Sequence, residues 1–340
     1  MKTTFLSRSP GGISLYELSN DSGMRVQVMD YGARLFALFV PDRCGESVNV
    51  LAGFDTPDGF LGDNPYFNAI VGRVANRMDH ARFTLDGVTY YLNANDGVHH
   101  LHGGREGFDR KMWTVLEASD GAVTMRYVSA DGEEHYPGNL TVTVTYRLGA
   151  DNALSLDYEA TTDRPTPVNI TNHAYFNLDG DFASVLDHDV RIAASRVMVA
   201  DDELIYHGEL RDVADTIYDF RAMRSIGSRL TPVDPPVIGQ GGYDLSYVLD
   251  QRPTQPVASV CSHKTGLWMH VETDRPCLQF YTGNLLDGSV VGRHRYGYQS
   301  AFCMEAQDYP NAPNVPAFPS VVLRPGEIYR SHTVYRFACE

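Results

Sequence analysis

The stretch LTVTVTYRL, residues Leu140–Leu148, alternates apolar side chains with threonine or arginine. Neighbouring residues of an extended chain point to opposite faces, so this alternation predicts a β-strand with one buried and one wet face. A turn at residues 149–152 follows, and Ala153–Thr162 then repeats a strand-like pattern. The two segments predict an antiparallel pair within a sheet.

Hairpin signals of the same kind recur on both sides of this pair. Asp-Gly turns separate strand-like runs at Asp86-Gly87 within residues 82–92, and at Asp120-Gly121 between residues 112–118 and 123–129. Residues 327–337 are expected to form a closing strand, and no long, capped helical pattern is evident. The chain is therefore predicted to be all-β: one domain over residues 1–340, built as a large, mostly antiparallel β-sandwich with few short helices.

The composition limits the classes of partner. The chain has 28 Lys+Arg and 43 Asp+Glu, a formal net charge of −15 at pH 7. Because binding to nucleic acid and anionic lipid rests on clustered Lys/Arg, which the sequence lacks, we expect no nucleic-acid and no membrane partner. The N-terminus lacks the apolar stretch of a signal peptide, so the expected compartment is the cytoplasm. The five cysteines are scattered without a Cys-x-x-Cys pair and are expected to stay reduced.

The densest polar cluster is the histidine-rich segment at residues 99–106. On an extended backbone His100 and His102 would point to the same side and could hold a metal between them. The spacing His100-x-His102-x-x-x-Glu106 resembles the metal-binding core of cupins, an all-β family, although that pattern expects glycine where Ala94 and Trp113 stand. The other interpretation is one functional or structural histidine among solvated ones.

Two further segments place polar residues in apolar runs. His173 lies within residues 168–178 together with three asparagines, which predicts a buried polar network or a ligand site unless the histidine is simply a satisfied core residue. Glu305 lies within the apolar run at residues 301–307, where desolvation would raise its pKa and suit it to act as a base. The alternative for Glu305 is a structural ion pair with an arginine.

The segment Gly-Arg-Val-Ala-Asn-Arg at residues 72–77 supplies Arg73 and Arg77. Either arginine could be a surface charge, or could donate a fork of hydrogen bonds to a polar ligand. The sequence contains no Gly-x-Ser-x-Gly motif and no glycine-rich dinucleotide fingerprint, so serine hydrolases and Rossmann oxidoreductases are disfavoured.

Taken together, these segments resemble the aldose 1-epimerases, also called galactose mutarotases. The matching segments are residues 72–77, 101–104 with 107–109 and Trp113, 136–138, 171–178, 242–244, 278–284, and 305–307 with Pro310 and Asn314. They run in the family's order from about residue 65 to Gly326, so the resemblance covers essentially the whole chain.

The resemblance implies a galactose mutarotase-like supersandwich and an isomerase that interconverts the α and β anomers of free aldohexoses such as galactose and glucose. Such an enzyme opens the pyranose ring and recloses it on the other face of C1, which needs an acid and a base but no cofactor and no metal. The implied partner is a monosaccharide of hexose and galactose metabolism, and the chain is expected to be a monomer or homodimer.

By the same resemblance, Glu305 is the base at O1, His173 is the acid at the ring oxygen, and His102 hydrogen-bonds near that oxygen. The residues implied to bind sugar hydroxyls are Asn76, Arg77, Asp244 and Gln279.

Four further positions are expected at the walls or the rim of the pocket. Phe176 or Tyr281 is expected to face the apolar side of the sugar. Asn68 and His99 stand where the family usually has glycine and asparagine, and both are expected at the rim of the pocket.

Three alternatives remain open. A cupin-like metalloenzyme predicts metal on His100, His102 and Glu106. A catalytically silent sugar-binding relative predicts binding without anomer interconversion, although a pure binder does not need the implied acid–base pair. A sugar-phosphate epimerase would need basic residues beyond Arg77 near the site.

Overall fold

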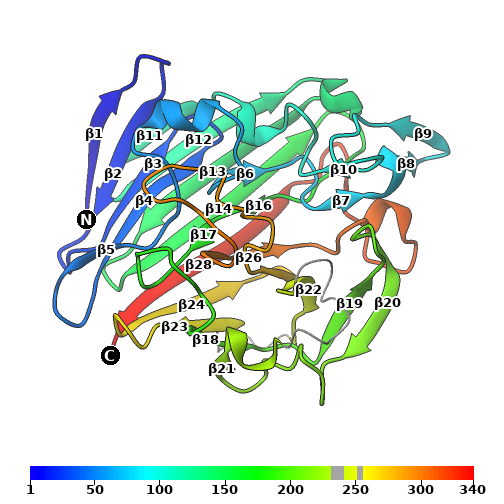
Figure 1. The fold of residues 1–340 in the computed structure, drawn as a ribbon. Coiled ribbons are helices and arrows are strands. Elements are labelled where there is room, and N and C mark those ends of the chain that lie inside the picture. Colours follow the sequence, from blue (N-terminus) through cyan, green and yellow to red (C-terminus); the bar gives the residue numbers. More distant parts are fainter. Residues whose placement is uncertain (231–240, 251–255) are drawn as a thin grey trace.

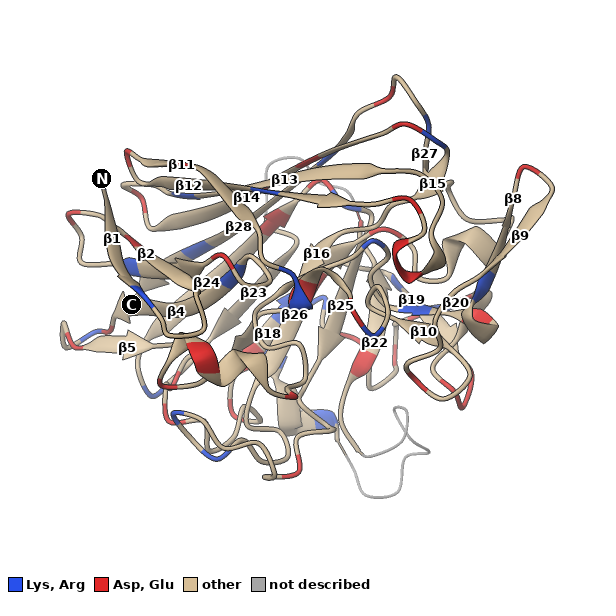
Figure 2. Cartoon of the chain, turned by 90° about the horizontal axis from the view of Figure 1, so that it is seen from above, with Lys and Arg blue, Asp and Glu red and all other residues tan. Residues whose placement is uncertain are grey.

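A computed structural model describes residues 1–230, 241–250 and 256–340. Within these residues the chain forms β-sheets joined by loops and short 3-10 helices, without an α-helix (Figure 1). The predicted all-β antiparallel architecture is confirmed. No helix in the described part of the chain is long and apolar enough to cross a membrane. Acidic and basic residues are interspersed over strands and loops (Figure 2).

The largest sheet has nine strands and contains the segments from which the fold was predicted. Its spatial order is β11 (Thr114–Ser119), β12 (Ala122–Ser129), β13 (Leu140–Leu148), β14 (Ala153–Thr162), β28 (Tyr329–Cys339), β24 (Leu267–Thr273), β23 (Ala258–Cys261), β18 (Asp189–Ile192) and β21 (Arg224–Ser225). β13 and β14 have the predicted bounds and pair antiparallel from Leu140↔Thr162 to Leu148↔Leu154. The closing strand starts two residues later than expected, at Tyr329.

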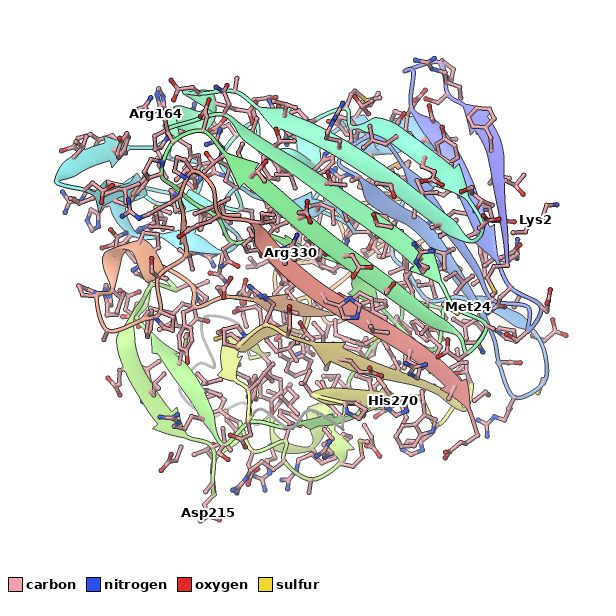
Figure 3. The ribbon with its side chains drawn as sticks, turned by 180° about the vertical axis from the view of Figure 1, so that it is seen from behind. Lys2, Met24, Arg164, Asp215, His270 and Arg330 are labelled. Carbon is pink, nitrogen blue, oxygen red and sulfur yellow. The ribbon has the colours of Figure 1, made fainter. Side chains whose placement is uncertain are left out.

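The two faces of this sheet differ as the threonine alternation predicts. Val142, Val144 and Tyr146 are fully buried, whereas the residues between them are partly exposed. The wet face carries polar side chains such as Arg330 and His270 (Figure 3). The buried face of this sheet, which carries Val142, Val144 and Tyr146, therefore packs into the hydrophobic core.

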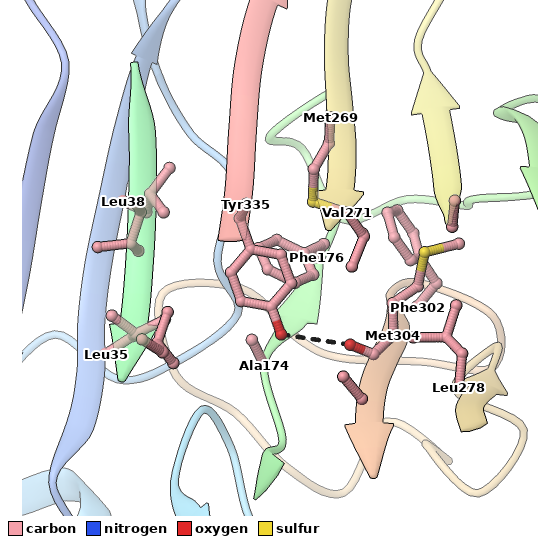
Figure 4. Close-up of a cluster of buried hydrophobic side chains, with 14 of the residues drawn as sticks. Leu35, Leu38, Ala174, Phe176, Met269, Val271, Leu278, Phe302, Met304 and Tyr335 are labelled. Carbon is pink, nitrogen blue, oxygen red and sulfur yellow. Dashed lines mark hydrogen bonds between the residues drawn. The ribbon is translucent and has the colours of Figure 1, made fainter. Parts of the chain in front are cut away.

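A second sheet has six strands and positions the candidate site. Its order is β17 (Tyr175–Phe176), β26 (Phe302–Gln307), β25 (Cys277–Tyr281), β22 (Asp244–Val248), β19 (Arg196–Ala200) and β20 (Tyr206–Asp212). One face packs Leu278, Phe302 and Met304 into the hydrophobic core. The hydroxyl of Tyr335 on β28 donates to the carbonyl oxygen of Met304 at 3.2 Å, which ties the six-stranded sheet to the nine-stranded one (Figure 4).

A third sheet has five strands and closes the core from the N-terminal side. Its strands are β1 (Lys2–Arg8), β2 (Ser14–Ser19), β3 (Arg25–Met29), β4 (Arg34–Pro41) and β5 (Ser47–Asn49). Val26 and Leu38 from this sheet join the same hydrophobic cluster as Val144 and Met304. All three large sheets thus share one core.

Short elements connect the sheets and carry loop residues to the site. The two-stranded pairs are β10 (His100–Leu101) with β7 (Arg77–Met78), β15 (Thr166–Pro167) with β27 (Val322–Leu323), β16 (Thr171–Asn172) with β6 (Ile70–Val71), and β8 (Arg82–Leu85) with β9 (Val88–Tyr91). The 3-10 helices are η1 (Pro57–Leu61), η2 (Asp79–Ala81), η3 (Phe108–Arg110), η4 (Glu133–His135), η5 (Ile226–Arg229) and η6 (Ala312–Asn314). The predicted hairpin at Asp86-Gly87 is confirmed as β8–β9.

Candidate active site

One pocket brings together all seven residues that the sequence singled out for catalysis and hydroxyl binding. Its volume is about 110 Å³, and its lining comprises Pro65, Tyr66, Asn76, Arg77, Leu101, His102, His173, Tyr175, Asp244, Gln279, Tyr281, Leu285 and Glu305. These residues come from the six-stranded sheet and from loops and short strands at residues 65–66, 76–77, 101–102, 173 and 285. A polar floor with aromatic walls suits a small polar ligand.

The sheet positions the pocket floor through its register. Gln279 on β25 lies opposite Glu305 on β26, and Asp244 on β22 lies opposite Tyr281 on β25. Because side chains alternate between faces along a strand, the neighbours Met304 and Phe280 enter the hydrophobic core instead. The polar residues therefore share the face that is turned away from the core.

Glu305 is a buried carboxyl group with one unsatisfied oxygen. The residue is 2% exposed, and its Oε1 lies 3.7 Å from Nε2 of His173. Its Oε2 has no hydrogen-bond partner in the described part of the chain, and no arginine there forms an ion pair with it. Burial raises the pKa of Glu305 well above its usual value; the negative charge of Asp244 adds to this rise, and Arg77 opposes it.

His173 is held by its backbone and by a neighbouring ring. Its N–H donates to the carbonyl of Ala69 and its carbonyl accepts from the N–H of Asn68, both at 2.9 Å. Its ring stacks on Tyr175, with the centroids 4.9 Å apart and the planes 9° from parallel. Nδ1 lies 3.6 Å from Sγ of Cys303. Burial lowers the pKa of His173 to about 3, so an isolated imidazolium is disfavoured here.

The proton on His102 is assigned by a backbone contact. The N–H of Asn76 donates to Nδ1 of His102 at 3.2 Å, so a neutral His102 carries its proton on Nε2. Burial lowers the pKa of His102 well below its usual value, and the neighbouring His173 and Arg77 lower it further. Neutral His102 therefore presents an N–H donor from Nε2.

A close contact between two loops fixes the position of His102. His102 adopts a left-handed conformation with φ of 51°, and Gly103 follows it with φ of 91°. A Cβ on Gly103 would overlap the carbonyl oxygen of Gly72. Glycine alone allows this approach, which presses the His102 turn against the segment that leads to Arg77.

The other polar residues form pairs around the same pocket. Nε2 of Gln279 donates to Oδ1 of Asp244 at 2.7 Å, and Oδ1 of Asn76 accepts from the N–H of Arg77 at 2.7 Å. Nε of Arg77 donates to Oδ2 of Asp96 at 2.7 Å. Burial raises the pKa of Asp244, although Arg77 opposes that rise.

The chain matches a family model for aldose 1-epimerase over residues 14–336. The chain belongs to the aldose 1-epimerase family. The predicted family is thereby confirmed, and with it the predicted enzyme class, an isomerase that epimerises aldoses at C1.

Relatives with known names cover almost the whole chain of this aldose 1-epimerase. Galactose mutarotase from Bos taurus is 40% identical over 332 residues, which are 96% of this chain and 95% of that protein. Aldose 1-epimerase from Escherichia coli is 39% identical over 331 residues, again 96% and 95%. The solved structure of an aldose epimerase homologue from C. elegans has a TM-score of 0.89 at 30% identity, over 95% of this chain and 98% of that one.

The cupin-like alternative is not supported by the arrangement. Both ring nitrogens of His100 are used, with Asn93 O and the Tyr136 hydroxyl each at 2.8 Å. Glu106 is exposed and lies 3.6 Å from Nζ of Lys111. The left-handed backbone at His102 ends the extended geometry on which the expected histidine pair depended.

A metal on the pocket's own ligands fits poorly. His102, His173 and Glu305 each offer an atom within 4.8 Å of the others, a set that could hold a metal ion. A metal-bound histidine normally donates its other N–H to an acceptor. Nδ1 of His102 instead accepts a hydrogen bond, so Nε2 keeps its proton and has no free lone pair. This arrangement favours proton chemistry.

Two expectations about the pocket rim, those for His99 and Asn68, were wrong, and of the two candidates for the apolar wall only Tyr281 lies there. Phe176 is fully buried in the core against Phe302 and Tyr335, whereas Tyr281 does line the pocket. His99 is buried beside Asp79 and does not line the pocket.

Asn68 is structural and does not lie at the rim of the pocket. It is fully buried with φ of 58°, and its side chain bonds Ala52 O at 2.7 Å and the N–H of Tyr175 at 3.0 Å. Glycine and asparagine are the residues that adopt this left-handed conformation most readily, so an asparagine fits the backbone at this position.

Two aromatic walls of the pocket, Tyr66 and Tyr175, were not predicted from the sequence. The ring of Tyr66 lies 4.8 Å from that of His102, and Tyr175 stacks on His173. Tyr175 lies in the quoted segment 171–178, so its closeness to His173 was the available signal. Tyr66 lies in the loop between η1 and β6 and gave no comparable signal.

Proposed function

We propose that this aldose 1-epimerase interconverts the α and β anomers of free, neutral aldohexoses, galactose and glucose among them, with Glu305 and His173 as the acid–base pair. The supporting observation is the buried pair itself: Glu305 Oε1 and His173 Nε2 lie 3.7 Å apart at the floor of the pocket. An acid and a base so placed can each contact one oxygen at the anomeric centre.

Ring opening moves one proton from O1 to the ring oxygen. The carboxylate of Glu305 takes the O1 proton, O1 forms the carbonyl with C1, and the bond between C1 and the ring oxygen breaks. The electron pair of that bond goes to the ring oxygen, which takes a proton from His173. Rotation about C1–C2 and the reverse transfers then give the other anomer. Acid and base catalysis would each contribute about 10²–10⁴-fold.

Burial leaves the pair with a single shared proton. It raises the pKa of Glu305 and lowers that of His173, because each charged form loses water. Neutral Glu305 with neutral His173 holds the same number of protons as the Glu305 carboxylate with a His173 imidazolium. Ring opening can therefore begin without a proton from solvent. A sugar between the two groups completes the path for the transfer.

His102 would stabilise the charge that develops at the ring oxygen. Its Nε2–H is fixed as a donor by the bond from Asn76 to Nδ1. A donor that is oriented before the reaction costs no reorganisation during it.

The remaining polar residues would bind the sugar hydroxyls. Arg77 and Asn76 supply donors, and Asp244 with Gln279 supplies an acceptor and a donor. Tyr281, Tyr66 and Tyr175 provide apolar walls for the C–H face of the ring.

The charge of the pocket favours a neutral sugar over a sugar phosphate. Arg77 is the only lysine or arginine among the described lining residues, and Asp96 forms an ion pair with it. Asp244 adds a further carboxyl group. Relatives named galactose mutarotase make galactose the first substrate to test.

Polarimetry of freshly dissolved α-galactose tests the proposal directly. Glu305→Gln and His173→Ala are each expected to lower kcat by at least about 10²-fold, because each removes one proton transfer. Circular dichroism would verify that the variants fold. Near-normal rates in either folded variant would contradict the assigned pair, and a wild-type protein that binds galactose without speeding mutarotation would indicate a silent binding relative.

We also propose that the chain works in the cytoplasm as a monomer or homodimer. Its five cysteines, which all lie in the described part, form no disulfide, as is usual in a reducing compartment. Cell fractionation and light scattering would test the two parts of this proposal.

A further inference from the structure

Arg77 has a partner outside the pocket. Its Nε donates to Oδ2 of Asp96 at 2.7 Å, and its side chain is only 11% exposed. Asp96 does not line the pocket, and its side chain is 38% exposed. In a mobile surface ion pair the arginine side chain would be exposed. Arg77 is largely buried, so its contact with Asp96 holds in place a side chain that lines the pocket.

The loop that carries Asp96 is closed by specific contacts. β10 pairs with β7 so that Leu101 lies opposite Arg77. Asp96 and His99 then close a tight turn through His99 N–H to Asp96 O at 2.9 Å and Asp96 N–H to His99 O at 3.2 Å.

Asn95 fixes the same loop from within. Its Oδ1 accepts from the N–H of Leu101 at 2.8 Å, and its Nδ2 donates to the carbonyl of Leu101 at 3.0 Å. The residue next to Asp96 is thereby anchored opposite Arg77. The turn at Asp96–His99 and the side-chain bonds of Asn95 thus fix the position of the Asp96 carboxylate, so it can restrain Arg77.

The contact with Asp96 uses Nε of Arg77 and leaves the two Nη groups available for a ligand. A guanidinium presents its donors in a rigid, planar fork, so a bond at Nε orients both Nη groups. In the part of the chain that is described, no protein group bonds the Nη atoms of Arg77, which lines the pocket. An unrestrained arginine would lose side-chain entropy when it binds a ligand, and a restrained one has already lost part of it.

We propose that Asp96 is a positioning residue for substrate binding, which holds Arg77 so that its two Nη groups donate to hydroxyls of the bound sugar. Asp96 touches neither the substrate nor the acid–base pair and acts only through Arg77. The inference rests on the proposed sugar-binding function of the pocket.

Steady-state mutarotation of galactose by Asp96→Ala tests this role. We expect KM to rise about 5- to 20-fold while kcat stays within about threefold, because ground-state and transition-state contacts of Arg77 weaken together. Asp96→Asn keeps an acceptor oxygen for Nε and should recover part of the loss. Asp86→Asn removes one charge of an exposed ion pair with Arg324, 2.9 Å apart and away from the pocket, and should leave both constants unchanged.

A double-mutant cycle separates positioning from general damage. In an Arg77→Lys background, Asp96→Ala should change KM by less than about twofold, because the guanidinium that Asp96 holds is no longer present. An unchanged KM in the single variant, or an equal rise in both backgrounds, would overturn the proposal. Thermal unfolding of each variant would show whether the loop change costs stability. Failure of the wild-type chain to catalyse mutarotation would instead contradict the proposed function.

Discussion

At the scale of single residues, hydrogen bonds to ring nitrogens separate the histidines of the 99–106 segment. His100 uses both nitrogens within the fold, with Asn93 and Tyr136, and His102 uses one and turns the other to the pocket. The sequence pattern alone could not distinguish them, because His100 and His102 are two positions apart and an extended backbone makes them equivalent. The left-handed turn at His102 makes them different.

The fixed tautomer of His102 makes a specific prediction. His102→Ala should lower kcat by about 10²–10³-fold, because it removes an oriented donor at the ring oxygen. His102→Gln retains an amide donor and should lose less. The measurement is kcat by polarimetry on folded protein. A kcat of His102→Ala equal to that of the wild type would show that this donor does not act in the rate-limiting step.

The shared proton of His173 and Glu305 predicts the pH dependence. The active pair holds one proton, so kcat/KM should fall on the acid side as a second proton binds at His173, near its lowered pKa of about 3. On the alkaline side the rate should fall as the pair loses its shared proton, at a pH well above the usual pKa of glutamate because burial raises the pKa of Glu305.

Mutarotation of galactose across this pH range, corrected for the buffer rate, is the measurement. In Glu305→Gln the remaining activity should depend on protonated His173 alone, so its alkaline limb should move to lower pH, because burial lowers the pKa of His173. A wild-type rate that rises with pH through this limb would contradict a one-proton active form.

At the scale of elements, the length of a strand and the alternation of its side chains decide whether the strand can be predicted from the sequence. β13 and β14 were predicted to the residue because each is long, alternates cleanly and ends at a turn signal. β17 contains only Tyr175 and Phe176, too short for any period to show. Its pairing with β26, Tyr175↔Cys303 and Phe176↔Phe302, sends Phe176 to the core. The site residues were found through motif resemblance, whereas loop residues such as Tyr66 depend on tertiary packing.

β26 has one face in the core and one in the pocket, so substitutions on the core face should lower stability with little effect on KM. Met304→Ala should lower the free energy of unfolding by about 2–5 kcal/mol, because Met304 is fully buried on the core face. Its KM should change far less than in variants of the pocket face. Urea unfolding measures the loss, and Leu116→Ala on β11, 47% exposed, is a matched control expected to cost under about 0.5 kcal/mol. Equal losses in the two variants would contradict the assigned faces.

At the scale of the whole molecule, the shared core predicts cooperative unfolding. Val26, Val144 and Met304 belong to three different sheets but to one hydrophobic cluster. We therefore expect the chain to unfold as the single domain predicted from its sequence, with one calorimetric transition and equal calorimetric and van't Hoff enthalpies. Two resolved transitions would show that the sheets form separate domains.

The close approach of Gly103 to Gly72 has a consequence for protein engineering. The turn that carries His102 and the segment that carries Arg77 touch through backbone, so neither can be reshaped without displacing the other. A redesign that seeks a new sugar preference therefore has little freedom on the side of the pocket formed by His102 and Arg77. Leu285 lines the same pocket and is 62% exposed, so a library of substitutions aimed at a bulkier or differently substituted aldose is best directed there.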